Sequence, residues 1–328
     1  MALLQRVWAL LFTILLCATL ICSILPITYG NSGFVKVYFF DVGQGDAAFI
    51  DTDGLDVLVD GGSSDAGVRL LGYLMNLNVS KIDIVIATHP HEDHIGGLVA
   101  VLKSTIATNT ILYNGQLADT KIYSDFINLA HDKMVIAERG QTYILDFNVN
   151  LTILNPTQPL EFDDINSNSI VFRLQAGSIA LLFMGDATFE AEESIIRAGF
   201  NLNGQVLKVG HHGSRYATSH KFLDAANPKY AIISAGVGNP YGHPHQETLQ
   251  RLSEKGVLIY GTYACGTVVV STDGQIIKVN AAGTMEIPEF GISLQDRIIY
   301  LGLAFILVAV FLLITYRESM KRRVKRRP

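Results

Sequence analysis

The chain alternates short apolar runs with turns over most of its length, and amphipathic stretches lie between the later runs. Short apolar or alternating runs bounded by turn residues are typical of strands, and apolar positions three or four apart are typical of helices. The runs predict strands at 34–40, 47–52, 55–59, 82–88, 111–113, 134–137, 151–154, 170–174, 179–184, 206–209, 231–234, 257–260 and 267–271. The spaced positions predict helices at 68–77, 97–103, 123–131, 188–198, 218–225 and 246–255. This order favours an α/β fold in which two sheets pack together under outer helices.

Two further stretches are uncharged and long enough to span a bilayer, at 7–25 and 298–316. The first lies in a segment, 1–30, that is either a signal peptide or an uncleaved membrane anchor. The second precedes the basic tail 317–328, which predicts a transmembrane helix with a cytoplasmic C-terminus. Both interpretations of the first stretch place the domain between them, predicted at 31–290, outside the cytoplasmic membrane.

Charge and cysteine content constrain this domain further. The chain has 25 Lys and Arg residues and 30 Asp and Glu residues. When Arg6, Arg297, Glu318 and the seven basic residues of the tail are set aside, 16 basic and 29 acidic residues remain, so the net charge of the domain is about −13. Such an acidic domain argues against broad non-specific nucleic-acid binding. Cys265 is the one cysteine outside the first apolar stretch, so no disulfide within one chain braces the domain.

The densest set of metal-ligand residues follows the predicted strand 82–88, in the segment 88–97, called here the metal loop. His89, His91, Asp93 and His94 fall within six positions. Pro90 favours extended backbone before it, so the first two histidines project to one side, while the last two residues stand where the chain turns into a helix. Two pairs of ligands then face two nearby points, and imidazole with carboxylate suits zinc, manganese or iron.

Three later or neighbouring stretches supply candidate partners. Asp186 ends an apolar strand pattern, where one carboxylate is able to bridge two cations. His211 and His212 follow another strand, and a histidine from that loop would complete the second cation's ligands. Asp60, after the strand 55–59, is a candidate to orient a metal-bound histidine through its second ring nitrogen.

Two loops are candidates for contact with a ligand. The glycine-rich segment from Asp41 to Asp46 allows close backbone approach, but it lacks the lysine of a nucleotide P-loop. The segment from Asn239 to His245 is rich in hydrogen-bonding side chains, and either His243 or His245 is a candidate to contact substrate.

Together these motifs resemble a known superfamily. The pattern His89-x-His91-x-Asp93-His94, with Asp186 and the loop after residue 210, resembles the metallo-β-lactamase superfamily. Within it, residues 34–280 resemble the extracellular hydrolase domain of the DNA-uptake channel protein ComEC. The motifs that carry this resemblance are Phe40-Asp41-Val42-Gly43-Gln44-Gly45-Asp46-Ala47, Asp60-Gly61-Gly62, Asn168-Ser169-Ile170-Val171, Met184-Gly185-Asp186, Leu207-Lys208-x-x-His211-His212-Gly213-Ser214 and Tyr241-Gly242-His243-Pro244.

The resemblance implies an αββα sandwich with a site for two divalent metal ions, zinc or manganese, at one edge. By this resemblance, His89 and His91 would bind the first metal, Asp93 and His94 would bind the second, and Asp186 would bridge the two. One of His211 and His212 would join the second metal. Asp60 would orient a metal-bound histidine, and the residues expected around the ligands are Asp41, Asp46, Asn168 and Ser169. At the place where many members of the superfamily supply a third ligand to the first metal, this sequence has the Asn168-Ser169 segment and no histidine. A mononuclear site is therefore the alternative. The multi-span channel of ComEC is absent from this sequence.

The expected activity is hydrolysis of a phosphodiester, because two cations acidify a shared water and hold both the entering and leaving oxygens. Asp93 is expected to act in catalysis, and His243, Asn239 and Ser214 are candidates to steady the phosphate or protonate the leaving group. The favoured substrate is a phosphodiester such as DNA. One alternative substrate is a cell-envelope phosphodiester, such as a teichoic-acid or phosphocholine link, and another is a β-lactam or lactone. A further alternative is that the domain is a binding module without catalysis. The negative charge should weaken the capture of nucleic acid unless cations cluster near the cleft, for which the local candidates are Lys208, Arg215 and Lys221. The predicted partners are the membrane and the substrate, and the sequence does not indicate a protein partner.

Overall fold

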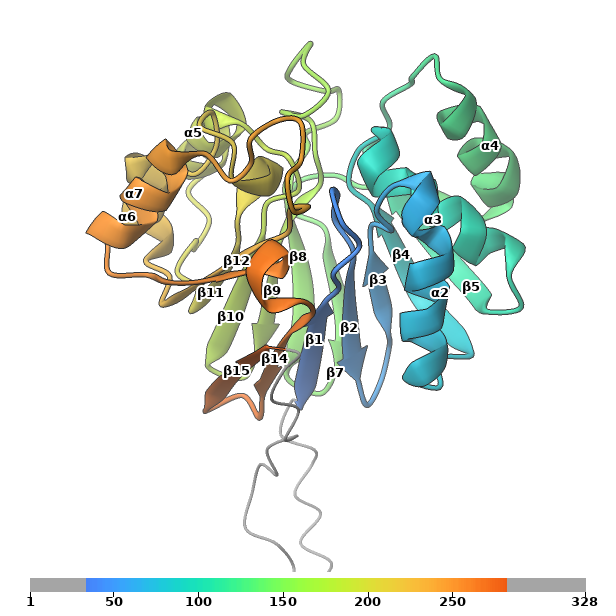
Figure 1. Cartoon of the computed structure of the whole chain (residues 1–328), viewed down its shortest axis with the longest axis horizontal. Helices are drawn as coiled ribbons and strands as arrows, with labels where there is room; N and C mark the ends of the chain where they lie inside the picture. The colour runs from blue at the N-terminus through green and yellow to red at the C-terminus, as the bar shows by residue number, and fades with distance from the viewer. Residues whose placement is uncertain (1–33, 282–328) are drawn as a thin grey trace, which may run out of the picture. The chain divides into compact units, whose positions relative to one another are not determined.

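Two β-sheets lie face to face between two layers of helices in the computed structural model, which describes residues 34–281 (Figure 1). The first sheet has the order β15 (Ile277–Ala281), β14 (Val268–Thr272), β1 (Val35–Phe39), β2 (Ala48–Thr52), β3 (Val57–Val59), β4 (Lys81–Ala87), β5 (Ala107–Tyr113) and β6 (Met134–Ile136). The second has the order β13 (Leu258–Gly261), β12 (Tyr230–Ile233), β11 (Val206–Lys208), β10 (Ile179–Phe183), β9 (Val171–Ala176), β8 (Val149–Asn155) and β7 (Thr142–Asp146).

The helices fall into two groups, one on the outer face of each sheet (Figure 1). The first sheet carries α2 (Gly67–Asn76), α3 (Glu92–Lys103) and α4 (Lys121–Ala130), and the second carries α5 (Phe189–Arg197), α6 (His220–Ala226) and α7 (Gln246–Glu254). Shorter helical turns are η1 (Ser64–Ala66), η2 (His131–Lys133), η3 (Gly210–Gly213) and α8 (Thr262–Cys265). This arrangement is the predicted α/β sandwich.

Three apolar clusters hold the layers together. The central cluster lies between the sheets and includes Phe39, Phe172 and Phe183, all buried. A second cluster joins the first sheet to its helices, and a third joins the second sheet to its helices. Strands buried on both faces need continuous apolar runs, and β10 is buried at all five positions.

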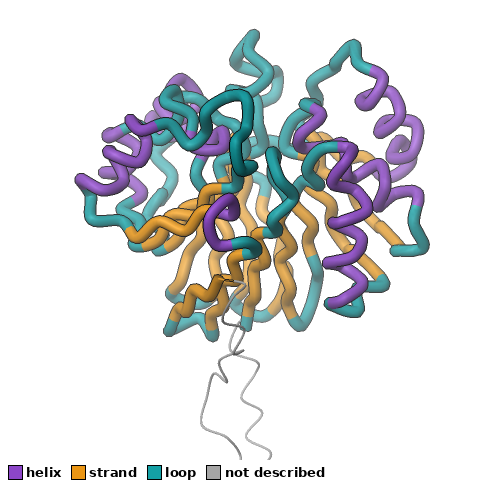
Figure 2. Tube along the Cα trace, in the orientation of Figure 1, coloured by secondary structure: helices purple, strands orange, loops and turns teal. Residues whose placement is uncertain are grey.

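Parallel strands bring the loops with chemistry to one edge. β3 and β4 are parallel in the first sheet, and β10, β11 and β12 are parallel in the second. Their carboxyl ends therefore face the same edge of the sandwich, where Figure 2 shows the longer loops gathered. The metal loop follows β4, and Asp186 follows β10 at this edge.

The structure corrects some predicted boundaries. The helix expected at 97–103 begins at Glu92, because His91 is the extended residue before it and two acids, Glu92 and Asp93, occupy the first turn, where the helix dipole favours negative charge. Two strands, β7 and β15, were not predicted. One of the five positions of β7 is buried and none of those of β15 is.

No helix among residues 34–281 has the length and hydrophobicity to cross a bilayer. The predicted segment 1–30, the predicted transmembrane helix 298–316 and the tail 317–328 lie outside the described residues.

Candidate metal centre

Asp60 lies beneath the metal loop and fixes the orientation of His94. Its Oδ2 is 2.8 Å from His94 Nδ1. The same carboxylate accepts hydrogen bonds from the backbone N–H of Thr88 at 2.8 Å and from its hydroxyl at 2.7 Å. A ring held through Nδ1 presents Nε2 as the free ligand atom. The structure therefore places Asp60 where an orienting acid was predicted.

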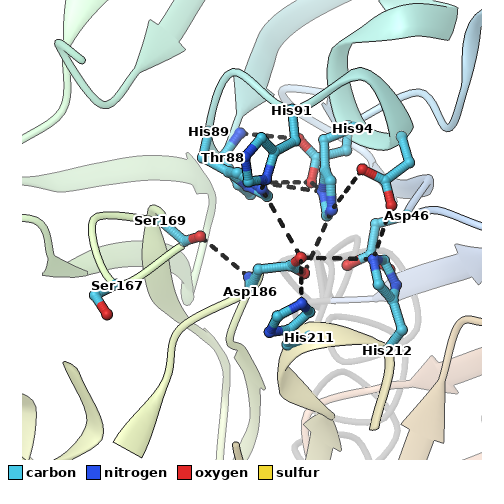
Figure 3. A network of polar contacts seen from close by, with 12 residues as sticks. Asp46, Thr88, His89, His91, His94, Ser167, Ser169, Asp186, His211 and His212 are labelled. Carbon is cyan, nitrogen blue, oxygen red and sulfur yellow. Dashed lines mark hydrogen bonds and ion pairs between the residues drawn. The ribbon is translucent and has the colours of Figure 1, made fainter. Parts of the chain in front are cut away.

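His89 and His91 face one point in front of the sheet edge. His89 Nε2 lies 3.0 Å from His91 Nδ1, and 3.8 Å from Asp186 Oδ2 (Figure 3). The strand end and Pro90 deliver both rings to the same side, as the extended geometry predicted. His89 thus contacts both His91 and Asp186, and the ligand atoms that lie together around it are those of His94 and Asp186.

Asp186 lies at the centre of the cluster, between ligands from both sheets (Figure 3). Its Oδ1 is 3.3 Å from His94 Nε2, and its Oδ2 is 3.6 Å from His212 Nε2. Ser169 Oγ accepts a hydrogen bond from the Asp186 backbone N–H at 3.1 Å, so this serine fixes the position of the acid. One carboxylate within reach of both ligand sets suits a bridging role.

The two adjacent histidines after β11 have different environments. Both have left-handed backbone, with φ of 48° at His211 and 52° at His212, a strained conformation that persists only where the surroundings enforce it. His212 is buried, with Nδ1 3.0 Å from the Ser234 carbonyl oxygen and Nε2 3.3 Å from Asp93 Oδ2. His211 is partly exposed, and its Nε2 lies 3.7 Å from Asp186 Oδ2. His212 is therefore the histidine that faces the second ligand set.

Asp46 supports His212 from the glycine-rich loop. Its Oδ1 is 3.1 Å from His212 Nδ1, and its Oδ2 is 2.7 Å from the ammonium of Lys208. Burial would raise the pKa of Asp46, but Lys208 and His212 outweigh it and lower that pKa to about 2. Lys208 is itself buried and paired with Asp46, so this candidate cation is not available to capture nucleic acid.

Glycines allow the loops around the site to pack closely. A Cβ at Gly45 would overlap the carbonyl oxygen of Asp93, and the neighbouring Asp46 N–H donates to that oxygen at 3.1 Å. A Cβ at Gly97 would overlap the carbonyl oxygen of Gly61. The glycine-rich loop therefore holds the backbone of the metal loop, where the sequence suggested close approach to a ligand.

The charges in the cluster balance one another. Burial would lower the pKa of His94, but the carboxylates of Asp186 and Asp60 raise it well above its ordinary value. Burial would raise the pKa of Asp186, but His212 and His94 hold it well below the usual range. Burial and the neighbouring His94 lower the pKa of His89 well below its ordinary value. Because the carboxylates hold a proton on His94, a cation that binds this ring would displace the proton, and binding should release it to solvent.

The donor set fits divalent cations. Ligand atoms of His89, His94 and Asp186 all lie within 4.8 Å of one another, as do those of Asp93, His94 and His212. His94 Nε2, His212 Nε2 and Asp186 Oδ1 are buried without a hydrogen-bond partner. Buried polar atoms are normally satisfied, and nitrogen with carboxylate oxygen is the donor mixture of zinc and manganese sites.

The cluster opens into a cleft of about 610 Å³. The residues that line it are Gln44, Ser63, His91, Glu92, Asp93, Asn166, Asp186, His211, His212, Pro240, Tyr241 and His243. Burial, together with His212 and His211, lowers the pKa of His243 to about 4, so this ring is neutral near pH 7.

Two predicted substrate contacts, Asn239 and Ser214, do not line the cleft. The Asn239 amide donates to the carbonyl oxygens of Gly236 and His243 and accepts from the N–H groups of Tyr241 and His243, so it shapes its own loop. Ser214 is buried, and its hydroxyl accepts from the backbone of the residue two positions on. Both side chains therefore bond within their own segments.

The segment opposite the metal loop also differs from expectation. Asn168 is buried and turned into its own loop, where its amide donates to the Phe162 carbonyl oxygen at 2.6 Å. Asn166 lines the cleft instead, with a buried Oδ1 that has no hydrogen-bond partner. Spacing did not single out Asn166, because only the conformation of the loop decides which of the two asparagines faces the cleft.

Asp41 and the two remaining cations also lie apart from the ligands. The Asp41 carboxylate accepts from Gly43 N–H within its loop, and its carbonyl oxygen accepts from the Tyr73 hydroxyl. Arg215 pairs with Glu247 at 2.9 Å, and Lys221 pairs with Glu193 at 3.0 Å. Both cations therefore form surface ion pairs, and neither lines the cleft.

Comparison with known proteins agrees with this geometry. Residues 40–146 match the model of the Metallo-beta-lactamase superfamily. These residues are therefore similar to the metallo-β-lactamase superfamily. The chain is 29% identical over 252 residues to ComE operon protein 3 of Bacillus subtilis, covering 71% of this chain and 32% of that protein. It is 34% identical over 242 residues to Competence protein ComA of Neisseria gonorrhoeae, covering 73% of this chain and 32% of that protein.

A third relative is Recombination protein 2 of Haemophilus influenzae, 29% identical over 254 residues, covering 76% of this chain and 30% of that protein. The chain spans about a third of the length of these three curated relatives. The predicted resemblance to the ComEC-like branch is confirmed by these matches.

Proposed function

We propose that the domain is a metal-dependent phosphodiesterase that cleaves nucleic acid. The observation that carries this proposal is the position of Asp186 between two ligand sets at the floor of an open cleft. Similarity to proteins named for competence and recombination supports nucleic acid as the substrate. A pair of divalent cations supplies an acidified water and neutralises the phosphate in such sites.

Each side chain has a role in this proposal. His89, His91 and Asp186 hold one cation, as proposed from the sequence. Asp93, His94, His212 and Asp186 hold the other, and the contacts of His212 with Asp93 and Asp186 support it over His211. Three residues orient these ligands: Asp46 contacts His212, Asp60 contacts His94, and Ser169 bonds to the backbone of Asp186.

His243 is the residue that contacts the phosphate in this proposal. Its ring lines the cleft and is neutral near pH 7, because its pKa is lowered to about 4. A neutral imidazole donates one N–H to a phosphate oxygen, but it is a poor proton source for a leaving alkoxide. His243 therefore steadies the phosphate, and the leaving oxygen takes its proton from solvent.

The test offers the purified full chain, with Mn²⁺ and then Zn²⁺, four substrates in parallel. These are single-stranded DNA, a bis-aryl phosphodiester, a phosphocholine ester and a chromogenic β-lactam. We expect cleavage of the first two, lost in the Asp93→Asn variant. Turnover of the β-lactam alone would overturn the phosphodiesterase proposal. Cleavage of the phosphocholine ester without DNA would move the substrate to the cell envelope, and binding without any turnover would indicate a non-catalytic module.

We further propose that one or two membrane segments hold this domain outside the cytoplasm, the stretch 298–316 in either case and the stretch 7–25 if it is not a cleaved signal peptide. The uncharged stretches 7–25 and 298–316 and the basic tail support this topology.

A further inference from the structure

The cleft carries an aromatic ring and no basic side chain. Tyr241 is 62% exposed and is the one Phe, Tyr or Trp among the lining residues of the described chain. None of the lining residues within 34–281 is Lys or Arg, while Glu92, Asp93 and Asp186 all contribute acid. Apart from the bound cations, this wall offers a nucleic acid little electrostatic attraction.

The loop that carries Tyr241 is held firmly. Asn239 accepts hydrogen bonds from the backbone N–H groups of Tyr241, at 3.2 Å, and His243, at 3.0 Å. Its amide also donates to the Gly236 carbonyl oxygen at 2.9 Å. An exposed aromatic side chain on a braced turn loses little conformational freedom when a ligand stacks on it.

Stacked rings connect Tyr241 to the metal centre. The Tyr241 ring lies 5.8 Å from the His243 ring, centroid to centroid, with 24° between their planes. The His243 ring lies 5.4 Å from that of His211, which faces Asp186. His243 thus lies beside the tyrosine ring, and the 62% exposure of Tyr241 leaves a face of that ring open to a ligand close to the metal centre.

We propose that the open face of Tyr241 stacks on the nucleobase next to the scissile phosphate, so that the substrate is a single strand or an unpaired strand end. This inference rests on the proposed phosphodiesterase function and names its substrate class. A base paired inside a duplex has both faces covered by its neighbours, so it is not available to a protein ring. Stacking on aromatic side chains supplies affinity that does not depend on positive charge or sequence.

A choline headgroup is the competing ligand for an exposed aromatic ring. Choline is recognised by cages of several aromatic faces around the cation. The described lining of this cleft offers one tyrosine beside histidines, which suits a planar base better.

The test compares two ligands that share a sugar and a phosphate but differ in the base. Binding of adenosine 5′-monophosphate and of ribose 5-phosphate to the Mn²⁺-loaded full chain is measured by calorimetry, which needs no turnover. We expect the nucleotide to bind roughly 5- to 150-fold more tightly, the range of one base stacked on an aromatic ring. Tyr241→Ala should abolish this ratio without changing the affinity for ribose 5-phosphate, and Tyr241→Phe should keep it.

Tyr216→Ala is the matched control, because Tyr216 is 65% exposed and does not line the cleft. In hydrolysis of a single-stranded oligonucleotide, Tyr241→Ala should raise KM and leave kcat nearly unchanged. An unchanged ratio of the two affinities in Tyr241→Ala would overturn the stacking role while leaving the phosphodiesterase proposal intact. Tight phosphocholine binding that depends on Tyr241 would also overturn it. Failure of both phosphates to bind, with no phosphodiester cleaved, would refute the proposed function itself and the inference with it.

Discussion

Two acids of one loop show how strongly the fold separates neighbouring residues. Asp41 and Asp46 flank the same glycines, and both were predicted to lie around the metal ligands. Only Asp46 reaches them, 3.1 Å from His212 Nδ1, whereas the Asp41 carboxylate bonds within its loop. Metal affinity should therefore depend on one of these acids and not on the other.

We expect Asp46→Asn to lower the affinity for the second divalent cation by roughly 10- to 100-fold, the usual effect of losing a carboxylate that orients a metal-bound histidine. Calorimetric titration of the metal-free protein with Zn²⁺ measures this change. Asp41→Asn is the matched control and should bind as the wild type does. Equal losses in the two variants would contradict the assignment.

Asp46→Asn also leaves the Lys208 ammonium buried without its carboxylate, which should cost about 3–5 kcal/mol of unfolding free energy. The double variant Asp46→Asn with Lys208→Met separates the two effects. It should recover much of the stability in a denaturant titration, while the defect in metal binding persists.

The adjacent histidines give a second prediction at this scale. His212 contacts Asp93 and Asp186 through Nε2, and His211 contacts Asp186 alone. Metal analysis of the purified variants should find about one cation fewer per chain in His212→Ala. His211→Ala should lose less metal. The reverse order would show that His211 is the ligand.

At the scale of elements, the sequence predicted what depends on local pattern. The strand 82–88 and the ligands after it were readable because a buried strand needs an apolar run and a metal loop concentrates imidazole and carboxylate. The burial of Lys208 and the choice of Asn166 over Asn168 were not readable, since each depends on contacts between segments far apart in the chain. The start of α3 was placed late because its first turn is polar.

Helix α5 holds the segment between η3 and α6 through Glu192. This side chain is buried and accepts hydrogen bonds from the backbone N–H groups of Thr218 and Ser219. Burial raises the pKa of Glu192 from 4.5 to about 7, although these hydrogen bonds act in the opposite direction. The folded domain therefore binds this proton more tightly than the unfolded chain does, and the resulting stabilisation is full below about pH 4.5 and is lost as pH rises through about 7.

We expect Glu192→Gln to flatten this pH dependence. Between pH 4 and pH 8 the unfolding free energy of the metal-free wild type should fall by roughly 2 to 3 kcal/mol more than that of the variant. Denaturant titrations across this range, with chelator present, measure the difference. Glu193→Gln, at an exposed neighbouring position, should keep the slope of the wild type. A wild-type slope in Glu192→Gln would show that this carboxyl titrates normally.

At the scale of the whole molecule, the charge of the domain and its cleft point in the same direction. A net charge of about −13 on the predicted exported part repels a polyanion, and the cleft lining adds no Lys or Arg among the described residues. Capture of DNA through surface cations would give a steep loss of affinity with added salt. Capture through the metal centre and a stacked base should give only a small loss of affinity with added salt. This fits a substrate that is bound by its end or as a short single strand.

The proposed topology gives the final prediction. The uncharged stretches at 7–25 and 298–316 and the seven cations of the tail predict that residues 31–296 face outward and that the tail faces the cytoplasm. Protease added to intact cells, with the outer membrane opened where there is one, should digest the domain and spare an epitope placed on the tail. Lysed cells are the control, in which both should be cut. Protection of the domain and digestion of the tail in intact cells would reverse the topology. An outward domain would act on nucleic acid from the surroundings, where an acidic surface limits non-specific binding and the cleft alone selects the strand.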